Sequence, residues 1–117
     1  MLFRSYLLEI IKLCDRLVHA DGTPESTLRY LEEVQARLKL RQQAYQQTPL
    51  REEEWTLEVA LADGFMQEGY ELWFRGLEGL LESCADPPDE VAIVDWLETL
   101  REGNRNWLFV ERLSQVR

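Results

Sequence analysis

Residues 52–84 read EEEWTLEVALADGFMQEGYELWFRGLEGLLESC, and this stretch decides the fold class. Its apolar and small residues recur at steps of three and four, which is the spacing of one helix face and not of a strand. The spacing continues across Gly64, so it predicts a single helix from Glu52 to Cys84. Such a helix is roughly 50 Å long at about 1.5 Å per residue. We therefore expect it to be the long central helix of a bundle, with its inner positions at Trp55, Val59, Ala62, Met66, Gly69, Trp73, Leu77, Leu80 and Cys84.

The apolar side of this predicted helix is wide. On a helical wheel it covers roughly 220°, about twice the stripe of a helix that packs on one side only. Such a helix needs neighbours around most of its girth, from the same chain or from a second copy. We expect a homodimer, with the second copy on the flank opposite Tyr70 and Phe74, which carries Leu57, Leu61, Phe65 and Leu72.

Four glycines, Gly64, Gly69, Gly76 and Gly79, interrupt the predicted helix. Each costs up to about 1 kcal/mol relative to alanine inside a helix, so four of them need a physical reason. Gaps at Gly69 and Gly76 would admit a neighbouring backbone or a bulky ring. Two alternatives are a kink near Gly64 and a ligand pocket lined by Met66, Gly69, Tyr70, Trp73 and Phe74.

The remaining sequence predicts four further helices and no strand. One covers 2–19, and a second covers 24–46 after the start signal of Thr23 and Pro24. Thr48 and Pro49 repeat that signal before the long helix. Gly103 with Asn104 is typical of a helix end, so we expect separate helices over 89–102 and 105–115. The expected fold is all-α, a single domain over 1–117 with about five helices.

The charge of the chain is unevenly placed. Its net charge is −9, and residues 50–117 hold sixteen acidic against six basic residues. Binding to nucleic acid or to an anionic membrane is therefore disfavoured, and no apolar stretch reaches the length of a membrane span. One helix face forms an acidic surface that would suit a basic protein partner, with Glu68, Glu71, Glu78 and Glu82.

The N-terminal pattern and the cysteines bear on location. Charges interrupt the apolar residues of 1–9, which favours an amphipathic helix over a secretory signal. Cys14 and Cys84 fall on predicted apolar faces, which favours buried free thiols, although a disulfide between helices remains possible. A cytoplasmic location is the simplest expectation.

The residues that could carry chemistry are few. His19 is the one histidine, and it falls in the last turn of a predicted helix, where a cation favours the helix end. Cys14, Asp15 and His19 are close in sequence, but their spacing is a poor match to zinc sites. We expect no metal, no cofactor and no catalytic residue.

These observations favour a non-enzymatic protein-interaction or adaptor module with an apolar groove and an acidic surface. Trp and Tyr are enriched in interface hot spots, so Trp96 and Trp107 join the four residues of the dimer flank as interface candidates. The alternative is a helical carrier of a small molecule or an acyl chain, with its cavity beside Gly69.

Overall fold

The structure is a computed structural model that describes residues 2–19, 22–47, 52–85 and 87–115. Within these ranges it has four α-helices, a short 3-10 helix and no strand, which confirms the predicted all-α class. The elements are α1 (Leu2–His19), α2 (Pro24–Gln46), η1 (Glu52–Glu54), α3 (Leu57–Ser83) and α4 (Glu90–Gln115). Thr48 and Pro49 lie outside the described residues.

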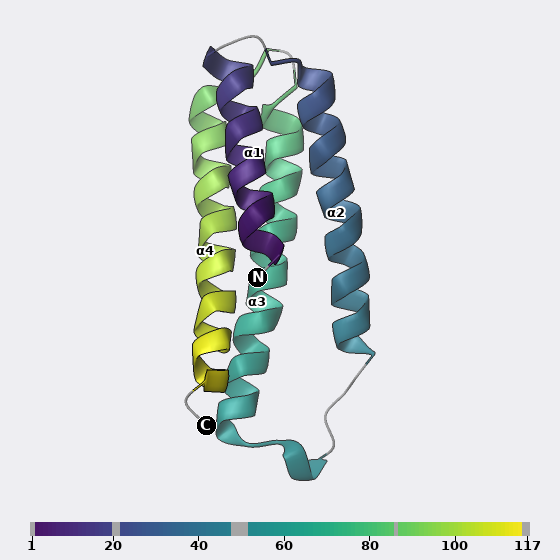
Figure 1. Cartoon of the computed structure of the whole chain (residues 1–117), viewed down its shortest axis with the longest axis vertical. Coiled ribbons are helices and arrows are strands. Elements are labelled where there is room, and N and C mark those ends of the chain that lie inside the picture. Colours follow the sequence, from purple (N-terminus) through teal and green to yellow (C-terminus); the bar gives the residue numbers. More distant parts are fainter. Residues whose placement is uncertain (1, 20–21, 48–51, 86, 116–117) are drawn as a thin grey trace.

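The helices form an elongated bundle of 54 × 24 × 19 Å (Figure 1). Each helix runs antiparallel to the next along the chain, and the last helix, α4, contacts the first, α1. The first turn of α1 lies about halfway along the bundle, so α1 covers only part of α3 and α4 (Figure 1). None of the helices in the described ranges combines the length and the apolar character that a bilayer span requires.

The start of α3 differs from the prediction. The helix begins at Leu57 and not at Glu52, because Thr56 has an extended backbone and its Oγ1 accepts a hydrogen bond from Val59 N at 3.2 Å. Glu52–Glu54 form the separate turn η1. Thr56 therefore supplies the helix cap, and the acidic residues precede it.

The expectation of five helices and of one exceptionally long central helix is also corrected. The predicted helices over 89–102 and 105–115 are one continuous helix, α4, which at 26 residues nearly equals the 27 of α3. Gly103 does not end the helix, since it is buried where a Cβ atom would lie 2.5 Å from Trp73 Cδ1. Its role is close packing, and Asn104 Oδ1 accepts a hydrogen bond from Trp73 Nε1 at 3.1 Å.

Glycines and large side chains interlock where α3 crosses α4. A Cβ atom on Gly69 would collide with the Trp107 indole, and one on Gly79 with the Trp96 indole. One on Gly76 would lie 2.6 Å from Leu100 Cδ2. The close-crossing interpretation is thus confirmed for these three glycines, whereas Gly64 has nothing within 4 Å and α3 continues through it.

The core runs along the middle of the bundle. Every helix contributes to it, and α3 supplies the largest share through Tyr70, Trp73, Leu77 and Leu80. The other core residues are Ile10, Cys14 and Leu17 from α1, Leu31, Val34 and Leu38 from α2, Cys84, and Ile93, Leu100 and Trp107 from α4.

Candidate protein-interaction surfaces

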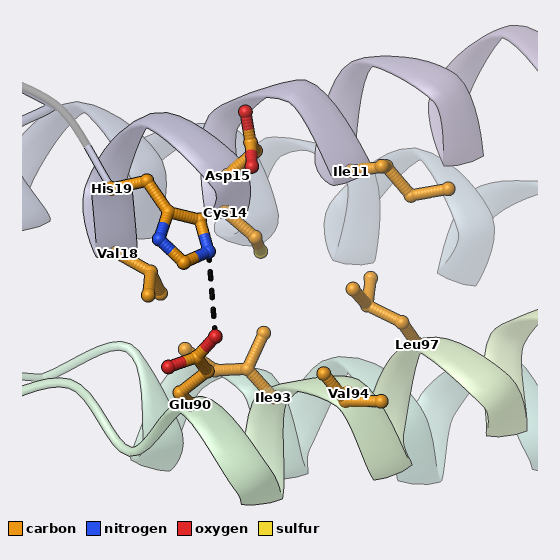
Figure 2. A pocket seen from close by; sticks show the side chains of 9 residues that line it. All are labelled: Ile11, Cys14, Asp15, Val18, His19, Glu90, Ile93, Val94 and Leu97. Carbon is orange, nitrogen blue, oxygen red and sulfur yellow. Dashed lines mark ion pairs between the residues drawn. The ribbon is translucent and has the colours of Figure 1, made fainter.

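A groove of about 150 Å³ lies between α1 and α4 (Figure 2). At one end His19 Nε2 lies 3.3 Å from Glu90 Oε1, and this pair joins the last turn of α1 to the first turn of α4. We call this feature the α1–α4 groove. Apolar side chains line most of it, and the lining residues are Ile11, Cys14, Asp15, Val18, His19, Glu90, Ile93, Val94 and Leu97.

A second apolar surface lies where α1 does not reach. His19, the last residue of α1, pairs with Glu90, the first residue of α4. The two helices run antiparallel (Figure 1), and α1 has 18 residues, so the part of α4 near Phe109 lies beyond the first turn of α1. Here Leu57 is 86% exposed and Leu61 is 46% exposed. The rings of Phe65 and Phe109 contact each other with centroids 4.7 Å apart. We call Leu57, Leu61, Phe65 and Phe109 the α3–α4 seam.

The six residues predicted for the interface differ in their exposure to solvent. Leu57 and Leu61 are exposed, whereas Phe65, Leu72 and Trp96 are half-buried. Trp107 is only 1% exposed: its ring stacks on Trp73, and its Nε1 donates to Met66 O at 3.3 Å. Trp107 thus belongs to the core, because the gap at Gly69 admits its indole.

The residues of the predicted pocket do not surround an empty space at Gly69. The Trp107 indole occupies the position beside that glycine. Tyr70 and Trp73 are core residues, and Met66 is half-buried against them. Phe74 instead lines a depression of about 470 Å³ between α2 and α3, with Glu32, Gln35, Ala36, Lys39, Gln42 and Glu78.

The acidic surface is solvent-exposed along α3. Glu68, Glu71, Glu78 and Glu82 are all exposed. Glu71, Glu78 and Glu82 share one side of α3, whereas Glu68 is closer in helical phase to the buried glycines. Glu78 also belongs to the rim of the depression between α2 and α3.

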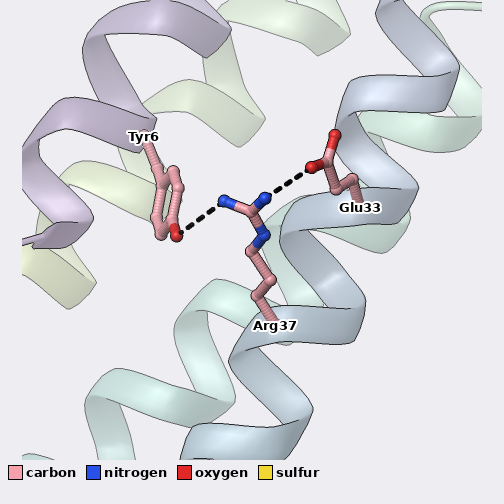
Figure 3. A network of polar contacts seen from close by, with 3 residues as sticks. All are labelled: Tyr6, Glu33 and Arg37. Atoms are coloured by element: carbon pink, nitrogen blue, oxygen red, sulfur yellow. Dashed lines mark hydrogen bonds and ion pairs between the residues drawn. The ribbon is translucent and has the colours of Figure 1, made fainter.

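Two polar contacts tie α2 to its neighbours. Arg37 Nη1 donates to Tyr6 Oη of α1 at 3.3 Å, and Nη2 lies 2.7 Å from Glu33 Oε1 (Figure 3). Near the C-terminal end of α2, Tyr45 Oη donates a hydrogen bond to Asp63 Oδ1 of α3. These contacts stabilise a helix whose outer face is strongly polar.

Cys14 and Cys84 lie together in the core, with their Sγ atoms 3.9 Å apart. The prediction of buried free thiols is confirmed. The contact between them has no local sequence signal, because the two residues are 70 positions apart.

The described residues include no group of three or more His, Cys, Asp or Glu side chains that could hold a metal ion. No protein-family model matches the chain, and neither the curated proteins nor the solved structures give a significant match. Evidence on function therefore comes from the surfaces of the molecule.

Proposed function

We propose that this protein is a non-enzymatic, self-associating protein-interaction module. Two copies meet through the α3–α4 seam. The α1–α4 groove of each copy takes the apolar face of a partner helix, and the acidic surface favours a basic partner. The observation that supports self-association most directly is the exposure of Leu57 and Leu61 beside the Phe65–Phe109 contact.

The seam has the features of a surface that is covered in a complex. Leu57, Leu61 and Phe65 follow one another at steps of four on α3, so they form one apolar line. Phe109, itself 40% exposed, extends that line onto α4. A continuous apolar patch on an otherwise charged molecule is typical of an interaction site.

Self-association is tested by substitution at the seam. We expect the wild-type protein to sediment as a dimer of 13.8 kDa chains at micromolar concentration. Leu61→Glu should give monomers with unchanged helical circular dichroism, because Leu61 is exposed and the change adds a charge at the contact. The matched control is Leu40→Glu on α2, where the leucine is 67% exposed and lies outside the seam.

Two outcomes would contradict this proposal. A wild-type protein that sediments as a monomer would remove the dimer altogether. Equal dissociation by Leu40→Glu and Leu61→Glu would show that added charge, and not the seam, controls association.

The groove is tested separately. A photoreactive amino acid at Val94, which lines the groove, should cross-link to a partner in native extract, and the same probe at Leu40 should not. A Val94→Glu chain added as competitor should fail to reduce that cross-link, whereas a Leu40→Glu chain should reduce it. If both positions give the same adducts, the groove has no preference for a partner.

A further inference from the structure

The thiols of Cys14 and Cys84 meet in the core of the bundle. They are the two cysteines of the chain, and their sulfurs lie 3.9 Å apart although they are 70 residues apart in sequence. Cys14 lies on α1, and Cys84 is the residue that caps the end of α3. A disulfide requires the sulfurs to approach from this distance to about 2 Å.

Both thiols are buried, with Cys14 2% and Cys84 0% exposed. Cys14 lines the α1–α4 groove, where Figure 2 shows its side chain between α1 and α4. Cys84 does not line the groove and is fully buried. A groove of about 150 Å³ is large enough for a molecule as small as a peroxide, and of the two cysteines Cys14 lines it.

We propose that Cys14 and Cys84 form a reversible intramolecular disulfide when a hydroperoxide oxidises Cys14 through the α1–α4 groove. This proposal does not rest on the proposed function. It adds a modification site that changes how firmly α1 is held in the bundle.

Formation of the disulfide takes two steps. The Cys14 thiolate attacks one oxygen of hydrogen peroxide, the O–O bond breaks, and Cys14 sulfenic acid and hydroxide form. Cys84 then attacks the Cys14 sulfur as the S–O bond breaks, and the sulfenic oxygen leaves as water. Two thiols are oxidised to one disulfide, and one peroxide is reduced to two waters. Two molecules of a thiol such as glutathione reverse the oxidation by two exchange steps, which restore both cysteines and release glutathione disulfide.

The contact between the thiols lets the pair share a single negative charge. The hydrogen bond from Cys14 lowers the pKa of Cys84, and the same bond, together with burial, raises the pKa of Cys14. Either sulfur can be the donor, so the single negative charge of the pair can also lie on Cys14 while Cys84 holds the proton.

The disulfide would fasten a helix that few buried residues hold. Among its described side chains α1 buries Ile10, Cys14 and Leu17. The new bond would close a loop that spans α2 and α3 and would fix α1 to the end of α3. Closing a loop of this length removes much conformational freedom from the unfolded chain.

The experiment treats the folded protein with stoichiometric hydrogen peroxide, alkylates the remaining thiols and measures the intact mass. We expect a loss of two hydrogen atoms and no alkylation, and thiol treatment should reverse both. The thermal unfolding midpoint of the oxidised protein should rise by about 10 °C. Val94→Trp, which narrows the groove, should slow oxidation, whereas Leu40→Trp should not.

Single variants separate the roles of the two cysteines. Cys84→Ala should accumulate a sulfenic acid at Cys14, detected by a sulfenic-acid-selective reagent, because no second thiol can resolve it. Cys14→Ala should leave Cys84 unmodified while its circular dichroism stays helical. The proposal is overturned if the wild type stays reduced, if it forms covalent dimers instead, or if Cys84 reacts as fast as Cys14.

Discussion

Tyr45 lies near the end of α2 and makes a polar contact with α3. Its hydroxyl donates a hydrogen bond to Asp63, and its ring centroid lies 6.1 Å from that of Tyr70. Burial raises the pKa of Tyr45 above its usual value of 10, and the hydrogen bond to Asp63 raises it further. The folded state therefore favours the neutral phenol.

This raised pKa predicts a loss of stability at high pH. In the unfolded chain Tyr45 ionises near pH 10, so its contribution is complete below that pH and is lost as pH rises through the higher folded pKa. Tyr45→Phe should cost about 1 kcal/mol at pH 7 through the lost hydrogen bond. It should also reduce the decline in unfolding free energy above pH 10.

Urea unfolding between pH 7 and pH 11.5 would measure both effects. Part of the decline should persist in Tyr45→Phe, because burial raises the pKa of Tyr30 and Tyr70 as well. An identical decline in wild type and variant would mean that Tyr45 ionises no differently in the folded protein.

At the scale of the element, two glycines of α3 should respond in opposite ways to the same substitution. Gly69→Ala places a methyl group within the Trp107 indole, so it should destabilise the protein by about 1–3 kcal/mol. Gly64→Ala meets nothing within 4 Å and should stabilise it by up to about 1 kcal/mol through helix propensity. Chemical denaturation of the two variants checks the prediction, and a gain of stability in both would show that the helices separate to admit the methyl group.

The helix faces could be predicted from the sequence, because the three-and-four spacing of apolar residues reports the core side directly. The helix ends could not. Gly103 resembles a helix end in the sequence, but Trp73, thirty residues earlier, packs against it inside a continuous helix. The cap of α3 is Thr56, and not the acidic residues that precede it. Periodicity places Leu57 and Leu61 on the predicted dimer flank, and both are exposed. The burial of Trp107 and the contact of Cys14 with Cys84 depend on tertiary packing, which the sequence pattern does not report.

At the scale of the whole molecule, the uneven charge should affect the rate of association. Attraction between exposed charges weakens as the Debye length falls from about 10 Å at 0.1 M salt to about 3 Å at 1 M. We therefore expect binding of the natural partner to slow as salt rises. Reversal of Glu71, Glu78 and Glu82 to lysine should slow it further, because all three carboxylates are exposed on one surface.

The matched control reverses Glu9, Glu25 and Glu111, which are exposed elsewhere and give the same change in net charge. Stopped-flow association rates would compare the two triple variants. Rates that are independent of salt, or equally slow in both variants, would leave the acidic surface with a role in solubility only.

The order of the helices around the bundle has a consequence for how the chain folds. Successive helices are neighbours, and in the described residues the contacts of α1 with α4 and of Cys14 with Cys84 join distant parts of the chain. Most contacts are therefore local, so folding should be fast, in microseconds to milliseconds. The α3–α4 hairpin, with the most extensive contact, should form in the transition state, and α1 should dock afterwards. Leu100→Ala should then slow refolding, whereas Ile10→Ala should chiefly accelerate unfolding. Refolding kinetics in which Ile10→Ala slows folding as much as Leu100→Ala would instead mean that all four helices assemble together.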